Sequence, residues 1–225
     1  MIKDLQMRLF TLDWKFEDLE DLQEIGRQNF QTSMEKESGT LFMAMGYATE
    51  RAERTYVIEI YADENAYNTH VASQHFQSFA SFAAEHLQGR QVLNLTPEIL
   101  VEKEGRLSLL QASNQQLRIA QLKIKENQID VFKDIVANEM KQSIQVEEGV
   151  NLLFGASVTD RPEEWIFIEL YQDQEAYDKH RQTSHFKTYI QKTKDMVLDK
   201  RLQILRPQLV VSKGGHSLQV SSQKT

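Results

Sequence analysis

"YADENAYNTHVASQHF" at Tyr61–Phe76 is matched further along the chain by "YQDQEAYDKHRQTSHF" at Tyr171–Phe186. Both stretches follow the pattern Y-x-D-x-x-A-Y-x-x-H-x-x-[ST]-x-H-F, and seven of the sixteen positions are identical. The two copies therefore share two histidines five residues apart, two tyrosines and one aspartate. A pattern of this length that recurs with its spacing intact indicates that one folding unit is present twice.

The similarity extends beyond the motif at the offset that separates Tyr61 from Tyr171. Three further pairs match at this offset: Gly39 with Gly149, Glu59 with Glu169, and Pro97 with Pro207. The offset is constant and has no gap. It is also far longer than the repeat of a solenoid protein, which is about 20–50 residues. The sequence therefore predicts two copies of one domain.

Each copy shows the order strand, helix, strand, strand, helix, strand. Helices are indicated by apolar residues three and four apart, as in Ile129, Phe132, Val136 and Met140. Strands are indicated by runs of β-branched and aromatic residues between turn signals. In the first copy we predict strands at 5–12, 40–48, 55–61 and 91–103, with helices at 16–33 and 76–87. Pro97 and Pro207 lie in the last strand of each copy, where we expect a bulge or an edge because proline cannot donate to the ladder.

The order βαββαβ is typical of a ferredoxin-like unit, a four-stranded antiparallel sheet with two helices on one face. The other face of such a sheet needs cover, and two copies can provide it by packing sheet on sheet. We expect an α+β protein with two ferredoxin-like repeats at residues 1–103 and 117–213. A linker at 104–116 and a flexible tail at 214–225 complete the predicted organisation.

Composition excludes several classes of function. The chain has 225 residues, a net charge of -7 and no cysteine, so disulfides and thiolate chemistry are ruled out. No basic cluster stands out, which argues against a nucleic-acid partner. Apolar runs are too short to span a membrane, and the beginning, "MIKDLQMRLF", does not have the pattern of a signal peptide. A cytoplasmic location is the expectation.

The motif A-Y-x-x-H-x-x-[ST]-x-H-F, after a strand that ends in E-x-Y, resembles the antibiotic biosynthesis monooxygenase (ABM) family. The resemblance covers both copies. It implies a dimeric α/β barrel, here with the usual homodimer fused into one chain as an internal pseudo-dimer. The family resemblance spans cofactor-free oxygenation of quinols and anthrones, isomerisation of a small phosphorylated signal and, in a related branch, haem degradation.

The haem-degrading branch fits this sequence poorly. Its members carry a tryptophan where this chain has His70 and His180, and a histidine where it has Ala80 and Ile190. The spacing of His70 and His75 is wrong for zinc on one continuous helix, and there is no dinucleotide-binding or phosphate-binding glycine motif. We therefore expect no cofactor and no metal.

The candidate catalytic residues are His70 and His180, with Glu59 and Glu169 as second choices. One imidazole per copy could reach a cavity between sheet and helices as a proton acceptor or a hydrogen-bond donor. The structural alternative is that the histidine only stabilises a break between two helical segments by bonding a backbone carbonyl. Ser73 or Thr183 would then cap the second segment.

Each of the two glutamates lies within an apolar strand. If that face lines the barrel interior, burial would raise the carboxyl pKa and make it a base. It could equally accept a structural bond from Tyr or Arg. His75 and His185 are expected at helix starts, and Phe76 and Phe186 in the core.

Three functions remain open. The first is a cytoplasmic, cofactor-independent monooxygenase that oxidises a small quinol-like or polyphenol-like aromatic with O2. The second is an isomerase of a small oxygenated metabolite, and the third is a barrel that binds a small molecule without catalysis. The copies differ at Trp14/Ile124, Phe10/Ala120 and Tyr47/Ser157, so their pockets need not take the same ligand. A further surface could also pair whole chains.

Overall fold

The structure is a computed structural model that describes residues 4–111, 113–214 and 217–219. The elements of the first repeat are β1(Gln6–Trp14), α1(Leu19–Lys36), β2(Thr40–Ala48), β3(Arg54–Tyr61), α2(Glu64–Ala72), α3(Gln74–His86) and β4(Leu87–Glu102). Those of the second are β6(Gln116–Ile124), α4(Ile129–Val146), β7(Val150–Val158), β8(Arg161–Tyr171), α5(Gln174–His180), α6(Ser184–Thr193) and β9(Val197–Ser212). Two short strands complete the sheet: β5(Leu107–Leu109) pairs with β9, and β10(Ser217–Gln219) pairs with β4. The predicted βαββαβ order is confirmed in both repeats.

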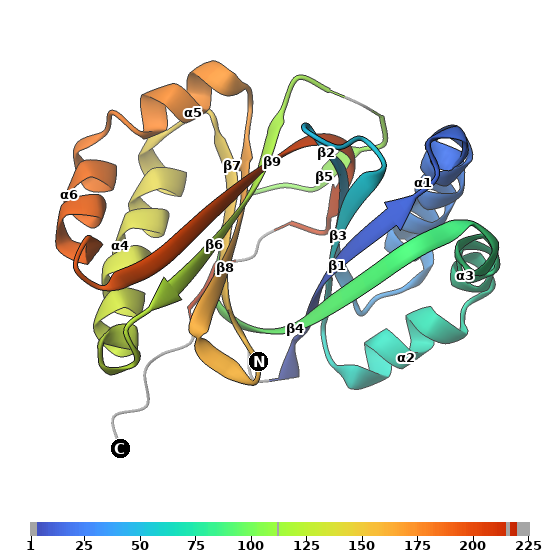
Figure 1. Cartoon of the computed structure of the whole chain (residues 1–225), viewed down its shortest axis with the longest axis horizontal. Coiled ribbons are helices and arrows are strands. Elements are labelled where there is room, and N and C mark those ends of the chain that lie inside the picture. The colour runs from blue at the N-terminus through green and yellow to red at the C-terminus, as the bar shows by residue number, and fades with distance from the viewer. Residues whose placement is uncertain (1–3, 112, 215–216, 220–225) are drawn as a thin grey trace.

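The strands close into a barrel with the helices outside it (Figure 1). The order is β1-β3-β2-β9-β6-β8-β7-β4, and β4 pairs with β1 to complete the ring. The long strand β4 pairs with β1 through its first half and with β7 of the other repeat through its second half. Strand β9 does the same with β6 and β2. The two predicted ferredoxin-like repeats therefore form an intramolecular dimeric α/β barrel through exchanged strands.

The prolines mark the points where the long strands change partners. The register between β4 and β7 shifts between Pro97 and Ile99. The register between β2 and β9 shifts at Met45/Gly46, opposite Leu209 and Pro207. These irregularities confirm the predicted bulges, and they follow from the missing N–H of proline.

Side chains alternate between two environments along each barrel strand. Ile58 and Ile60 belong to the apolar cluster that fills the barrel, together with Phe42 and Phe154 in edge contact at 5.1 Å. Met43 and Val57 face the other way, into a cluster closed by α1 and α3. Glu59 lies on this second face, so the condition that its face lines the barrel interior is not met.

Several sequence-based boundaries differ from the observed ones. The predicted helix at 16–33 begins only at Leu19, and Phe16 lies in a 3₁₀ turn with 70% of its surface exposed. Leu87, the last residue of the predicted helix at 76–87, instead opens the strand β4. Within the predicted linker, Leu107–Leu109 pairs with β9. In the predicted tail, Ser217–Gln219 pairs with β4, while 215–216 and 220–225 lie outside the described residues.

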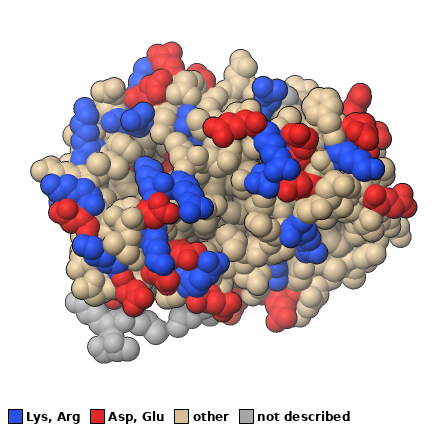
Figure 2. Space-filling model, in the orientation of Figure 1, with Lys and Arg blue, Asp and Glu red and all other residues tan. Residues whose placement is uncertain are grey.

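The charged surface shows no large region of one sign on the face drawn in Figure 2. Lys and Arg side chains there are interspersed with Asp and Glu. Among the described residues, no helix is long and apolar enough to cross a membrane.

Candidate functional site

The repeated motif begins with a helix cap and a close packing contact. Asp63 accepts a hydrogen bond from the backbone N–H of Ala66 at 2.8 Å, and so starts α2. Ala66 packs on Gly39, where any Cβ would lie well inside van der Waals contact of the alanine methyl. Asp173, Ala176 and Gly149 repeat this arrangement. The motif aspartate and alanine thus position the helix that carries the first histidine.

A helix break brings the two histidines of each motif together. Ser73 accepts from the backbone N–H of Phe76 and donates to the carbonyl of His70 at 2.7 Å. Thr183 makes the same two bonds with Phe186 and His180. The predicted caps are therefore confirmed. Because the chain turns at the cap, residues five apart approach a common partner, which they could not do on one straight helix.

That partner is a glutamate that the sequence reasoning missed. Glu37 follows the end of α1, and its carboxylate is hydrogen-bonded to His70 Nδ1 at 3.1 Å and to His75 Nε2 at 2.7 Å. Glu147 follows α4, and its carboxylate is hydrogen-bonded to His180 Nδ1 at 3.0 Å and to His185 Nε2 at 2.6 Å. The signal was present, because Glu37 and Glu147 match at the same offset as the two motifs and lie just before the matched glycines.

Both carboxylates are held in the charged form. Burial alone would raise the pKa of Glu37, but hydrogen bonds from His70, Thr40 and His75 outweigh it and lower the pKa to about 2. Burial likewise opposes ionisation of Glu147, while its bonds to His180 and His185 prevail and lower its pKa. Each glutamate thereby fixes the orientation of two imidazoles.

The first histidine of each motif is almost completely buried. His70 has no exposed surface, and its ring lies 5.4 Å from the ring of Tyr61 and 4.9 Å from that of Phe76. When Nδ1–H donates to Glu37, Nε2 retains its lone pair. His70 Nε2 has no hydrogen-bond partner among the described residues. An oriented imidazole with a free ring nitrogen is suited to accept a proton.

The predicted glutamates lie in the same layer between sheet and helices. The hydroxyl of Tyr61 donates to Glu59 at 2.9 Å, and Tyr171 donates to Glu169 at 3.0 Å. Burial raises the pKa of Glu59, partly offset by the charge of His70 and the bond from Tyr61. Burial and Glu59 also raise the pKa of the Tyr61 hydroxyl. The strand glutamates therefore have tyrosine partners, as the structural alternative proposed.

A small cavity adjoins this layer in the second repeat. It measures about 50 Å³ and is lined by His180, Glu169, Glu139 and Tyr177, with Lys200 and Leu202 of β9 among its other lining residues. Glu139 comes from α4 and was not a sequence candidate. The guanidinium of Arg118 lies 3.5 Å from the centre of the Tyr177 ring, as that of Arg8 lies 3.6 Å from the Tyr67 ring. The cavity thus joins an imidazole and two carboxyl groups.

The histidine–glutamate clusters contain residue types that bind divalent metals. In one cluster, ligand atoms of Glu37, His70 and His75 lie within 4.8 Å of one another; in the other, those of Glu139, His180 and His185 do. The contact of 2.7 Å between Glu37 and His75 is a hydrogen-bond distance. Two ligands of one tetrahedral metal ion stand about 3.4 Å apart. The first cluster therefore fits a hydrogen-bonded carboxylate better than a metal site, and His185 of the second is likewise bonded to Glu147.

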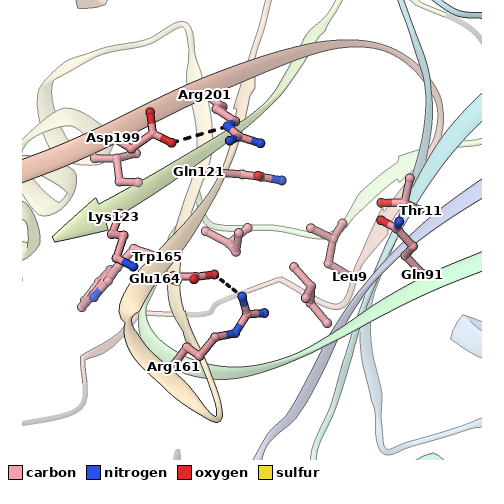
Figure 3. A pocket seen from close by; sticks show the side chains of 13 residues that line it. Leu9, Thr11, Gln91, Gln121, Lys123, Arg161, Glu164, Trp165, Asp199 and Arg201 are labelled. Carbon is pink, nitrogen blue, oxygen red and sulfur yellow. Dashed lines mark hydrogen bonds and ion pairs between the residues drawn. The ribbon is translucent and has the colours of Figure 1, made fainter.

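A larger cleft of about 380 Å³ lies between the repeats and contains none of the predicted site residues. Figure 3 shows Leu9, Thr11 and Gln91 of the first repeat on one side, with charged side chains of the second repeat opposite. Arg161 pairs with Glu164 at 2.6 Å, and Arg201 with Asp199 at 3.5 Å. Because these charges are paired within the cleft, it lacks the convergent chemistry of the histidine layer.

The family of the chain follows from comparison with known proteins. The model of the family described as "Antibiotic biosynthesis monooxygenase" matches residues 7–81 and again 116–192. A search of curated protein sequences found no match.

Solved structures support the tandem arrangement. A candidate monooxygenase from Lactobacillus acidophilus is 26% identical, with a TM-score of 0.90 over 96% of this chain and 99% of its own. One from Fusobacterium nucleatum is 22% identical, with a TM-score of 0.88 over 98% and 100%, and shares the fold. An anthrone oxidase-like protein is 11% identical, with a TM-score of 0.58 over 98% and 97%. With both repeats matched by the family model, this chain belongs to the antibiotic biosynthesis monooxygenase family and is a tandem member of it.

Proposed function

We propose that this protein is a cofactor-independent monooxygenase that oxidises a small aromatic compound bearing ionisable hydroxyl groups. The observation that carries the proposal is the buried histidine of each repeat, oriented by a glutamate through Nδ1. In His70 the other ring nitrogen has no partner among the described residues. Family membership supports monooxygenase chemistry in general. The choice of a substrate with ionisable hydroxyl groups rests on the oriented histidine, which can act as a proton acceptor.

The chemistry begins with proton transfer. In its neutral form, the imidazole of His70 or His180 takes the proton of a phenolic hydroxyl at Nε2, and Glu37 or Glu147 stabilises the imidazolium that forms. The resulting phenolate is electron-rich and passes electrons to O2. A quinol that reacts with one O2 yields a hydroxyquinone and one water. One oxygen atom enters the ring, and the quinol supplies all four electrons.

The strand glutamate offers a second group in the same layer. Because burial raises the pKa of Glu59, this carboxyl can hold a proton and donate a hydrogen bond to a developing oxyanion. Its orientation is set by the bond from Tyr61 at 2.9 Å. Glu169 has the same tyrosine bond in the second repeat. The sequence predicted a base at both glutamates, and the role proposed here is that of a protonated donor instead.

Access to the second pocket requires side-chain movement. A volume of about 50 Å³ accommodates a few water molecules or O2 but not an aromatic ring. Leu202 and Lys200 line the cavity from exposed positions on β9. We expect the substrate to enter past them, with Tyr189 of α6 moving away from the sheet.

The test is oxygen consumption by metal-stripped protein with a panel of quinols and anthrones. We expect uptake that falls by a factor of about 10² or more in the His70→Ala/His180→Ala double variant. His86→Ala is the matched control, because His86 pairs with Asp18 at 2.9 Å and lies outside the motif. Equal rates in the wild type and the double variant would contradict the proposed base. Proton exchange on a substrate without oxygen uptake would favour the isomerase instead.

A further inference from the structure

One buried position separates the chemistry of the two repeats. Asn29 on α1 and Glu139 on α4 occupy matching positions of the two repeats, one helical turn before Ser33 and Ser143. Asn29 is 2% exposed and Glu139 is 6% exposed. The same buried helix position thus carries an amide in one repeat and a carboxyl group in the other.

In the second repeat this carboxyl group faces the histidine. Glu139 Oε1 lies 3.7 Å from His180 Nε2 and accepts a hydrogen bond from the Ser143 hydroxyl at 2.8 Å. Both Glu139 and His180 line the cavity of about 50 Å³. A molecule in that cavity would therefore meet two groups that can exchange a proton.

In the first repeat the serine of this helix is arranged differently. The Ser33 hydroxyl lies 3.3 Å from His70 Nδ1 instead of turning to the Asn29 side chain. Among the described residues, neither Asn29 Oδ1 nor His70 Nε2 has a hydrogen-bond partner. Two buried acceptors without a donor are costly, so they favour a bound molecule that offers hydroxyl groups.

The surroundings of Glu139 support a shared proton. Burial raises the pKa of Glu139, and the nearby charge of Glu169 on β8 adds to this. His180 of α5 and His185 of α6 oppose it when protonated. Burial would lower the pKa of His180, but its bond to Glu147 and the charge of Glu139 outweigh it and raise the pKa. Each partner therefore favours the ionised form of the other.

We propose that Glu139 and His180 act as one proton-sharing pair, so that the second repeat carries out the proton transfer of the reaction. The first repeat, with Asn29 in place of the glutamate, binds hydroxyl groups but has no second proton-transfer group at this position. The inference rests on the proposed function and adds a catalytic residue to it. It also assigns different tasks to two repeats that share one motif.

The kinetic test replaces the glutamate by its counterpart. We expect Glu139→Asn to lower kcat about 10²-fold with little change in KM, because general acid–base groups contribute on this scale. Asp134→Asn is the control, since Asp134 is exposed on the same helix and undergoes the same chemical change. Thermal melting establishes that both variants fold. Wild-type kcat in folded Glu139→Asn, with turnover lost in His180→Ala, would leave the proposed function standing and overturn this inference.

A second measurement does not depend on turnover. The ring proton of His180 is followed by NMR during a pH titration, with assignment by a His180→Gln variant. Removal of the Glu139 charge should lower the titration midpoint of His180. A midpoint of His180 that does not move in Glu139→Asn would overturn the pair. If no quinol or anthrone supports oxygen uptake, the proposed function fails and this titration alone decides on the pair.

Discussion

At the scale of single residues, the buried glutamate between two histidines has the clearest consequence. Glu37 is 7% exposed and has its pKa lowered to about 2 from an ordinary value of 4.5. A lowered carboxyl pKa stabilises the fold above pH 4.5, and this stabilisation is lost as the pH falls toward 2. The glutamate therefore links acid stability to the geometry of the candidate site.

Replacement by glutamine should remove this dependence. We expect Glu37→Gln to flatten the fall in the free energy of unfolding between pH 4.5 and 2 by on the order of 2 kcal/mol, after allowance for solvent screening. Urea titrations at several pH values measure it. Glu20→Gln, an exposed change on α1, should keep the wild-type slope. The role of Glu37 would be refuted if both variants showed the same pH dependence.

The glycine–alanine contact is a second property of single residues. Gly39→Ala should destabilise the protein by about 1–3 kcal/mol, because the new methyl meets the methyl of Ala66. The double variant Gly39→Ala/Ala66→Gly removes that clash and should recover part of the loss. Chemical denaturation of the wild type, both single variants and the double variant measures the coupling. Strict additivity of the two changes would contradict the contact.

At the scale of elements, one ion pair joins a helix of the second repeat to a strand of the first. Lys133 on α4 meets Glu98 on β4 at 2.5 Å, and Ser157 on β7 donates to the same carboxylate at 2.9 Å. The side chains of Lys133 and Glu98 are 9% and 16% exposed. An ion pair and a hydrogen bond at Glu98 thus hold the second half of β4 against α4 and β7 of the other repeat.

Loss of one partner should be costly. We expect Lys133→Met to lower the free energy of unfolding by about 3 kcal/mol, since Glu98 would stay buried without its lysine partner. Lys133→Met/Glu98→Gln should be the more stable of the two variants. Urea denaturation compares them, with Lys123→Met at an exposed position of β6 as a surface control. A double variant less stable than the single one would count against the pair.

At the scale of the whole molecule, the exchange of β4 and β9 makes the barrel one unit. Each repeat supplies a strand whose second half belongs to the sheet of the other. The apolar cluster inside the barrel includes Leu9 and Ile58 of the first repeat and Ile119 and Ile168 of the second. Separation of the repeats would expose this cluster and leave both long strands unpaired.

A cut in the linker should therefore leave the halves together. With a protease site inserted after Asn114, we expect the cleaved protein to elute from a sizing column at the volume of the intact chain. Denaturing gel electrophoresis confirms that the cut is complete. Two separate peaks of half the mass, without denaturant, would show that strand exchange does not hold the barrel.

The sequence was sufficient for the large features and for part of the site. The constant offset between matching residues and the order βαββαβ predicted two ferredoxin-like repeats, and the proline positions predicted the bulges. The motif also identified His70 and His180, whose roles stay predictions. Glu37 and Glu147 were missed because they lie 33 residues before the histidines they bind, outside the motif.

The sequence by itself determined the doubled fold, because periodic apolar residues and a constant offset are local properties of the chain. Only the tertiary structure decided which face each strand glutamate occupies, and it placed Glu59 under the helices. It also decided that histidines five apart share one carboxylate, since the turn at Ser73 changes their direction. The approach of Glu139 to His180 likewise depends on α4 and α5 packing against the same strand, β7. Contacts between distant segments arise from packing, which no spacing along the chain encodes.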